Sequence, residues 1–395
     1  MQLSSISHLL LLLPIVLCVQ PFLPCLTALT SPQDVSALKA LKSAISPASI
    51  PPWSCLASWD FAAADPCSLP RRTHFVCGVA CSPDSTRVTQ LTLDPVGYSG
   101  QLTPLVSHLT ALLTLDLADN YFSGQIPASI GSIASLQSLT LRSNSFSGPI
   151  PAAVTTLKLV ESVDLSRNRL EGGIPKGLDS MLNLRRLDLS YNKLTGSVPK
   201  LPPNLLELAV RANSLTGPLA KSSFERAAQL EVVELGENSL GGTVEAWFFQ
   251  LPAIQQVNLA NNSLTRVVVP RASGNNAAGQ LVAVDLGFNE IEGEVPANFA
   301  GFPSLSALSL RYNKLRGRIP LEYSRKKSLR RLFLDGNYLI GKPPAGFFGS
   351  GAAVAAGSLG DNCLEGCPGS SQLCSPSQKS SEVCKQAYGG RKPRS

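Results

Sequence analysis

Carboxylates of this 395-residue sequence recur at equivalent places of a repeated pattern. Asp164 and Asp188 are 24 residues apart, and each stands between two apolar residues of a short alternating segment. If these segments are neighbouring strands, the two carboxylates lie about 5 Å apart, because paired strands have that spacing. A retaining glycosidase holds its two catalytic carboxylates at about this separation.

An open, curved sheet offers such a pair no pocket that excludes water. We therefore predict that the protein is not an enzyme. We interpret the carboxylates as a solvated acidic stripe, with contact to a basic partner as the alternative. The residue between the two apolar positions forms one row along the expected sheet, made of Thr92, Asp116, Thr140, Asp164, Asp188, Ala209, Glu234, Asn258, Asp285, Ser309 and Phe333.

A second group combines arginine with aromatic residues near the C-terminal end of the pattern. Its members fall on expected strand or strand-exit positions that face the solvent. Arginine and aromatic residues are enriched in binding hot spots, and exposed aromatic residues on an uncovered sheet indicate an interaction site. We predict a concave ligand-binding patch, with scattered surface residues as the alternative. The patch contains Phe288, Arg311, Tyr312, Arg331, Phe333 and Asp335.

Copies of one 24-residue unit position both groups. The segment Leu112–Ile133 reads LLTLDLADNYFSGQIPASIGSI, and its Leu, Asn, Gly and Ile-Pro positions recur after 24 and 48 residues. Two apolar residues with one gap form a short strand with both side chains buried. The Asn can hydrogen-bond to backbone where the chain leaves the strand, and the Gly permits a tight bend. This period and pattern are the signature of leucine-rich repeats, whose coils stack because one coil cannot bury its own apolar face.

The asparagine column defines the number of coils. Val96 takes the Asn position in the first coil, so residues 88–344 contain eleven repeats, and Asn362 begins a truncated twelfth. The longest spacing results from Val267–Gln280, which we interpret as a tolerated loop, with a small binding protrusion as the alternative. The column contains Asn120, Asn144, Asn168, Asn192, Asn213, Asn238, Asn262, Asn289, Asn313 and Asn337.

These repeats predict an α/β solenoid. We expect a right-handed leucine-rich-repeat superhelix with a parallel concave sheet about 50 Å long, given about 4.8 Å per strand. Disulfide-stapled caps are expected at the N- and C-terminal ends, because a stack of coils has two open apolar ends.

Residues 1–30 have the composition of a signal peptide. They carry no Lys, Arg, Asp or Glu, and Leu9–Val19 is an apolar run followed by small residues near Ala28–Thr30. This pattern is typical of a secretory leader, and Pro14 and the short length of the run argue against a membrane anchor. We expect cleavage near Ala28–Thr30 and a location in the extracellular space or cell wall.

Residues 31–87 are expected to form an N-terminal cap. Ser31 and Pro32 have the types that begin a helix, and Leu38, Leu41 and Ile45 follow at helical spacing. This helix would place its apolar face on the open end of the solenoid.

The following segment resembles the plant-type cap of extracellular leucine-rich-repeat proteins. Trp59, Asp65-Pro66-Cys67 and Cys77-Gly78-Val79-Ala80-Cys81 match its motifs, although the family's Trp before Gly-Val is absent and Thr73–Cys77 stands there instead. The resemblance covers residues 31–81 as cap and 88–344 as repeats. It implies a receptor-like ectodomain without a transmembrane helix or kinase.

Eight of the ten cysteines divide equally between the two ends of the array. Disulfides stabilise small extracellular caps, and each cluster of four allows three pairings. A secreted chain is oxidised and the C-terminal cluster has no histidine, so we predict four disulfides, no metal site and no cofactor. The residues are Cys55, Cys67, Cys77, Cys81, Cys363, Cys367, Cys374 and Cys384. The C-terminal cap is expected at 345–384, followed by a basic disordered tail at 385–395.

The basic character of the chain lies at its C-terminal end. The net charge is +7, and residues 301–395 contain 15 Lys and Arg against 5 Asp and Glu. An acidic polysaccharide or a peptide carboxylate would suit this charge, and we expect no nucleic acid because of the compartment. Asn261-Asn262-Ser263 is an N-glycosylation sequon, and a glycan at Asn261 would cover part of the concave edge.

Three functions remain open from the sequence. The first is a secreted recognition protein that binds a protein, peptide or acidic polysaccharide in plant defence or cell-surface signalling. A receptor ectodomain in the membrane would then be a partner, and the protein itself would not span the membrane. The second is an inhibitor of wall-degrading enzymes, since the cysteine count and basic charge are similar to polygalacturonase inhibitors. The third is a structural component of the cell wall.

Overall fold

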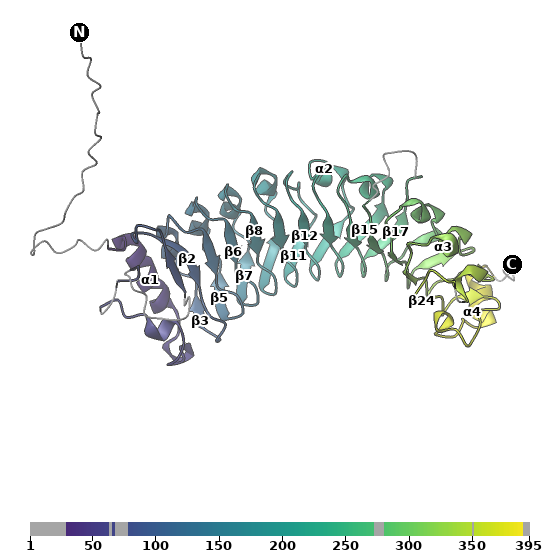
Figure 1. Ribbon diagram of the computed structural model, residues 1–395, viewed down its shortest axis with the longest axis horizontal. Helices are drawn as coiled ribbons and strands as arrows, with labels where there is room; N and C mark the ends of the chain where they lie inside the picture. The colour runs from purple at the N-terminus through teal and green to yellow at the C-terminus, as the bar shows by residue number, and fades with distance from the viewer. Residues whose placement is uncertain (1–28, 63–64, 68–77, 272–279, 350, 390–395) are drawn as a thin grey trace, which may run out of the picture.

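The computed structural model describes residues 29–62, 65–67, 78–271, 280–349 and 351–389. These residues form an elongated, curved solenoid with helix α1 (Pro32–Ala44) at one end and helix α4 (Ser381–Ala387) at the other (Figure 1). The expected signal peptide lies outside the described residues up to residue 28. No helix among the described residues is both long enough and apolar enough to cross a bilayer.

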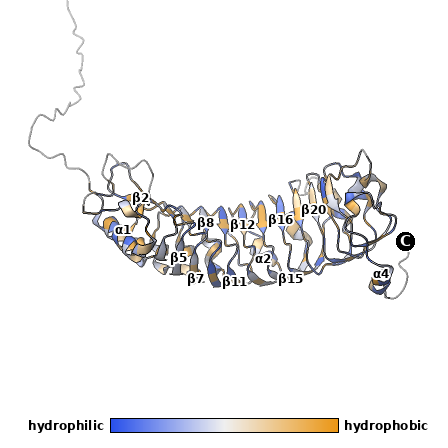
Figure 2. Ribbon diagram, turned by 90° about the horizontal axis from the view of Figure 1, so that it is seen from below, coloured by the Kyte–Doolittle hydropathy of each residue, from blue (hydrophilic) through white to orange (hydrophobic). Residues whose placement is uncertain are grey.

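One parallel sheet follows the inner curve of the solenoid, as the repeats predict (Figure 2). It begins with β1 (Val79–Cys81), which is antiparallel to β2, and every later pair is parallel and in register. β24 belongs to the truncated twelfth coil. The parallel strands are β2 (Val88–Thr92), β4 (Thr114–Asp116), β6 (Ser138–Thr140), β8 (Ser162–Asp164), β10 (Arg186–Asp188), β12 (Glu207–Ala209), β14 (Val232–Glu234), β16 (Gln256–Asn258), β18 (Ala283–Asp285), β20 (Ala307–Ser309), β22 (Arg331–Phe333) and β24 (Ala356–Ser358).

A second sheet, which the sequence analysis did not predict, is built from the segment after each asparagine. The Gly of this segment does turn the backbone, with φ +78 at Gly124, but it does so within a strand. The sheet contains β3 (Ser99–Gln101), β5 (Tyr121–Gln125), β7 (Ser145–Pro149), β9 (Arg169–Gly173), β11 (Lys193–Gly196), β13 (Ser214–Gly217), β15 (Ser239–Val244) and β17 (Ser263–Val267).

This second sheet ends at β17, where the long repeat begins. Strand β19 (Glu292–Glu294) pairs with β21 (Lys314–Arg316) instead, and β23 (Ile340–Gly341) pairs with β25 (Cys363–Leu364). Residues 272–279 of the insertion Val267–Gln280 lie outside the described residues, so its function stays a prediction. The main sheet continues past the insertion without a register shift.

Short helices form the outer side of the coils. In most coils the proline of the Ile-Pro pair, such as Pro127, stands immediately before the helix, where its missing N–H costs nothing. They are η3 (Pro104–His108), η4 (Ala128–Ser132), η5 (Ala152–Thr156), η6 (Lys176–Ser180), α2 (Lys221–Phe224), η7 (Ala246–Gln250), η9 (Ala297–Gly301), α3 (Leu321–Arg325) and η10 (Ala345–Phe347). Three more lie in the caps, η1 (Pro47–Ser49), η2 (Leu56–Ser58) and η11 (Gln372–Cys374).

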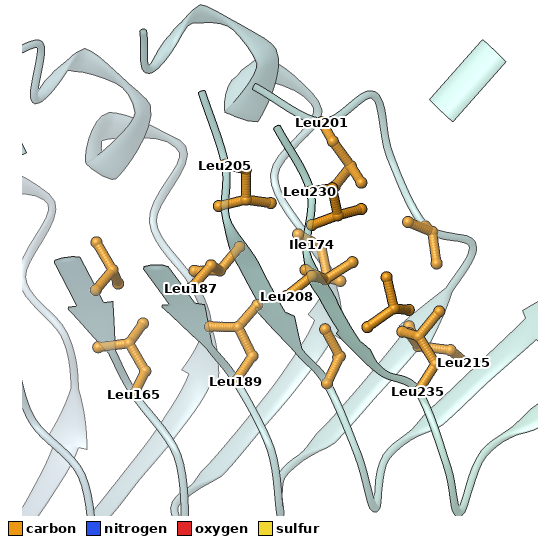
Figure 3. Close-up of a cluster of buried hydrophobic side chains, with 14 of the residues drawn as sticks. Leu165, Ile174, Leu187, Leu189, Leu201, Leu205, Leu208, Leu215, Leu230 and Leu235 are labelled. Atoms are coloured by element: carbon orange, nitrogen blue, oxygen red, sulfur yellow. The ribbon is translucent and has the colours of Figure 1, made fainter. Parts of the chain in front are cut away.

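The interior is one continuous column of aliphatic side chains. Leu187 and Leu189 of one coil pack beside Leu165 of the coil before and Leu208 of the coil after, all buried (Figure 3). Phe122 and Phe146 stack in parallel at 6.2 Å between ring centroids. Equivalent positions therefore bury against each other, which is why one coil needs its neighbours.

The asparagine column joins each coil to the preceding one. Asn313 is representative: its Oδ1 accepts from the Ile291 amide at 2.9 Å, and its Nδ2 donates to the carbonyls of Leu286 and Leu310 at 3.0 and 3.1 Å. The predicted hydrogen bonds to backbone are confirmed, and they also cross between coils. The same pattern recurs from Asn120 to Asn362.

The N-terminal cap covers the first coil through α1. Leu38, Leu41 and Ile45 are buried as predicted. The Asp34 carboxylate is fully buried, accepts from the Val88 amide at 2.7 Å and pairs with the Arg87 guanidinium at 3.1 Å. Helix α1 is thus fixed to strand β2 by charge as well as by apolar contact.

Both caps contain disulfides. Cys67 bonds to Cys81, Cys363 to Cys384, and Cys367 to Cys374. Cys55 is also disulfide-bonded, and Cys77 lies outside the described residues. Each of these disulfides joins two cysteines of the same terminal cluster, as predicted.

The predicted start of the disordered tail at residue 385 is wrong. Helix α4 continues to Ala387, and the Tyr388 hydroxyl accepts from the Gly317 amide at 3.0 Å and donates to the Tyr338 carbonyl at 2.9 Å. These bonds hold the end of the C-terminal cap against the last coils. Residues 390–395 lie outside the described residues.

We expect Asn313→Ala to destabilise the protein by about 3 kcal/mol, because it leaves several buried backbone groups without partners. Asn144→Ala removes an equivalent set of bonds at a half-buried position, where water can replace them, and should cost about 1 kcal/mol. Urea denaturation followed by circular dichroism measures both. Equal losses would show that burial does not set the strength of the ladder.

Candidate ligand-binding groove

A groove of about 430 Å³ crosses the concave face from β14 to β22. Its floor is formed by residues with little or no side chain. Ala283 and Ala307 start strands whose aligned residues elsewhere include Arg186 and Arg331. At the strand exits, Gly236, Ala260 and Gly287 take the position that holds Arg211 and Arg311 in other coils. The concave groove, as we name it, is therefore a run of coils with small residues at positions that elsewhere hold long side chains.

Two carboxylates lie in the floor of the concave groove, on β14 and β18. Glu234, Asn258 and Asp285 are in register on neighbouring strands. Glu234 accepts from the Asn258 amide group at 2.7 Å, and Asp285 accepts from the Gly287 backbone amide at 2.8 Å. Burial raises the pKa of the Glu234 carboxyl, and the negative charge of Asp285 adds to the rise. The floor is thus electronegative.

Arg311 organises the C-terminal end of the concave groove. Its guanidinium lies 5.6, 5.4 and 5.4 Å from the ring centroids of Phe288, Tyr312 and Phe333, and 2.8 Å from Asp335. Arg331 lies on β22 beside Phe333 and also lines the groove. The structure brings together all six residues of the predicted patch.

Asp335 differs from the prediction. We expected it on the exposed surface, but its side chain is only 1% exposed and binds Arg311 from below. It positions the arginine and does not face a ligand. Three buried polar atoms at this end have no hydrogen-bond partner among the described residues, namely Ser309 Oγ, Arg311 Nε and Asp335 Oδ1. Ser309 lines the groove, so a polar ligand group can reach its hydroxyl.

Phe288 and Tyr312 form a flat aromatic surface at the rim, which we call the aromatic platform. The two rings stack at 4.7 Å with an interplanar angle of 11°, and the residues are 43% and 39% exposed. Both backbones are left-handed, with φ of 56 and 49. This conformation costs a non-glycine residue about 1–2 kcal/mol. At Gly336, the next equivalent position, a Cβ would lie 2.5 Å from the Tyr312 ring, so glycine leaves room for the platform.

The opposite end of the concave groove was missed by the sequence analysis. There the Arg211 guanidinium donates to the Glu237 carboxylate, with 3.1 Å from Nε to Oε1. Arg211 and Glu237 are 26 residues apart, so the pair joins consecutive coils. The signal that could have found the groove was the run of Gly and Ala at positions that elsewhere hold long side chains.

The acidic row has a structural role in the N-terminal half. Asp164 and Asp188 are neighbours in register, as predicted. Each Oδ1 accepts from the backbone amide two residues further on, that of Ser166 at 3.0 Å and that of Ser190 at 2.8 Å. Burial raises the pKa of the Asp188 carboxyl, and Asp164 adds to the rise. These carboxylates stabilise the turn at each strand exit and lie outside the concave groove.

Comparisons with known proteins agree with this geometry. Two repeat families, described as Leucine rich repeat and Leucine Rich Repeat, match residues 203–264 and residues 111–133, 135–157, 159–181 and 183–205. The structure of PEPR1-AtPEP1 is 32% identical, with a TM-score of 0.73 over 84% of this chain and 45% of that chain. The chain is a leucine-rich-repeat protein. A second similar structure is the plant peptide hormone receptor RGFR1 in complex with RGF2, with 29% identity, a TM-score of 0.63 and coverage of 67% and 42%.

Curated relatives of this leucine-rich-repeat protein are longer receptors from Arabidopsis thaliana. A 105-residue stretch is 31% identical to the Calmodulin-binding receptor kinase CaMRLK, covering 26% of this chain and 15% of that protein. A 92-residue stretch is 29% identical to Receptor-like protein 7, covering 23% and 9%. The matches thus span a small part of each relative.

We expect Phe288→Asn to change the stability of this leucine-rich-repeat protein by less than about 1 kcal/mol, because Asn tolerates the left-handed backbone. Asn261 already occupies the equivalent position with φ 54. Phe288→Val should cost about 2 kcal/mol, since a β-branched residue is strained there. Thermal unfolding compares the two variants, and an equal loss would show that the ring stack sets stability at this position.

Proposed function

We propose that this protein is a non-catalytic recognition protein that binds a peptide, or an extended segment of a protein, in the concave groove outside the cell. The observation that carries the proposal is the groove itself, whose floor has small residues and whose two ends each carry arginine. From β14 to β22 there are four strand spacings, or about 19 Å. An extended chain rises about 3.3 Å per residue, so about six residues fit.

The similar structures support a peptide as ligand. RGFR1 is a plant peptide hormone receptor, and its structure is a complex with RGF2. An acidic wall polysaccharide fits the concave groove less well, because its carboxylates would lie beside Glu234 and Asp285. A peptide can instead match both signs of charge along its length. Its polar groups can also reach the unpartnered hydroxyl of Ser309.

The two arginines of the patch have different roles in this proposal. Arg311 is held by the buried Asp335, so reversing its charge would place two carboxylates together and unfold the site. Arg331 is exposed on β22 and lines the groove, so it is the arginine that contacts a ligand. Arg331→Glu is therefore the cleaner test of an anionic ligand group.

Filling the concave groove tests the proposed function. We expect the double variant Ala283→Gln and Ala307→Gln to fold normally, because Gln256 already stands at the aligned position of β16. The variant should lose most peptides that the immobilised wild-type protein retains from apoplastic fluid, as measured by mass spectrometry.

The matched control is Ser138→Gln, which changes the aligned position on β6 outside the groove. It should retain the same peptides as the wild-type protein. If the filled variant retains the full wild-type set, the proposed function is wrong.

Glycosylation at Asn261 gives a further prediction. Asn261 is exposed and lines the concave groove, so a glycan on it would cover part of the rim. We expect Ser263→Ala, expressed in a plant secretory pathway, to lose the mass of one glycan and to retain more peptide. Ser239→Ala, at the equivalent exposed position of β15, should change neither. Intact mass spectrometry checks the first result, and a wild-type mass without glycan would contradict the prediction.

A further inference from the structure

We propose that the peptide carries a basic residue bound between Glu234 and Asp285 and, two to three residues away, an aromatic or proline residue on the aromatic platform. This inference rests on the proposed function and names the chemistry of the ligand. Some charged side chains of the concave groove already form ion pairs within the protein, and others do not. The inference follows from this difference.

Two of the three arginines that line the concave groove have partners of their own. Arg211 is bound to Glu237, and Arg311 is bound to Asp335 at 2.8 Å. Each pair joins consecutive coils, so its geometry is fixed by the solenoid. These two cations are therefore compensated before any ligand arrives.

The two carboxylates of the floor bind only uncharged groups. Glu234 uses one oxygen to accept from the Asn258 side chain, and Asp285 uses one to accept from the Gly287 amide. The other oxygen of each carboxylate has no hydrogen bond within the described residues. The partly buried Glu234 therefore forms no ion pair among the described residues, although the positive charge of Arg211 acts on it from the end of the groove.

The spacing of the two carboxylates suits one cation. Glu234 and Asp285 are separated by the strand that holds Asn258, so they lie about two strand spacings, or 10 Å, apart. An ammonium or guanidinium group above Asn258 is then about 5 Å from both carboxylates. The small residues Ala260, Ala283 and Gly236 leave the space for a long side chain to lie there.

The aromatic platform provides the second subsite. Phe288 follows the strand of Asp285 in the same coil, and Tyr312 holds the equivalent position in the next coil. Along the solenoid, the platform begins in the coil of the upper carboxylate, and its centre lies about one and a half strand spacings, or 7 Å, from the centre of the carboxylate pair. An extended peptide covers that distance in two to three residues. A flat ring, or the ring of proline, can stack on the exposed face.

A random seven-residue peptide library displayed on phage tests the inference. The library is selected on the immobilised full chain, and clones that also bind the variant Ala283→Gln and Ala307→Gln are removed. We expect the remaining groove-dependent clones to be enriched at least fivefold for Lys or Arg placed two to four positions from Tyr, Phe, Trp or Pro.

A defined pair of peptides gives the quantitative arm. One synthetic peptide reads Gly-Ser-Lys-Gly-Ser-Tyr-Gly, and the second has Glu in place of Lys. We expect the Lys peptide to bind the wild-type protein at least tenfold more tightly in isothermal titration calorimetry. The variant Glu234→Gln and Asp285→Asn should remove this difference, whereas Asp116→Asn and Asp164→Asn, outside the groove, should preserve it.

The outcomes separate the inference from the proposed function. Groove-dependent clones without basic enrichment, or equal affinities for the two synthetic peptides, would overturn the inference and leave the proposed function standing. A library that yields no groove-dependent clone would count against both. Folding of the Asn and Gln variants is checked by thermal unfolding, and Asn258 shows that Asn is compatible with this row.

Discussion

The structure depends on the hydrogen bonds that the asparagine column makes between coils. Each side chain accepts from one backbone amide of the preceding coil and donates to carbonyls of both coils, as Asn313 does with Ile291, Leu286 and Leu310. The bonds satisfy backbone groups that the turn would otherwise leave buried without partners. They also fix the distance and the register between coils, and the apolar column of the interior forms within that frame.

Because the register between strands is fixed, residues at the same position of successive repeats form a row on the concave surface. Glu234, Asn258 and Asp285 are aligned in this way without a shift. The residue type at one repeat position therefore decides which chemical group lies at that point of the concave face. The concave groove is made by leaving side chains out, at Ala283 and Ala307 for example, so it needs no insertion and no rearrangement of the backbone. Recognition can therefore diverge in such a solenoid while the interior stays unchanged.

The sequence was sufficient to predict the structural features that depend on the repeat period. The concave strands, the buried leucines, the clustering of cysteines and the grouping of Phe288 with Arg311 all follow from aligned positions. The second sheet did not follow, because the glycine typified by Gly124 was interpreted as a bend, whereas its φ of +78 is accommodated inside a strand.

The burial of Asp335 did not follow either, because it depends on what comes after the last full coil. The twelfth coil is truncated, yet its backbone pairs on both sides of Asp335, where the amides of Leu334 and Gly336 donate to the carbonyls of Ser358 and Gly360. A repeat pattern describes a coil that has a neighbour on each side. It contains no information about how the last coil of the solenoid is covered. The residues nearest a cap are therefore those for which exposure is hardest to predict.

The aromatic platform shows how the solenoid balances folding against recognition. The asparagine bonds require a left-handed residue just before each asparagine, and small or polar residues such as Asn261 suit that backbone best. Phe288 and Tyr312 occupy the position at a cost in backbone energy, offset in part by their stacking and by Arg311. Tyr191 holds the same position outside the groove, where Arg167 lies over its ring. In the proposed function, the two consecutive rings of the platform differ from Tyr191 because their exposed faces contact the ligand.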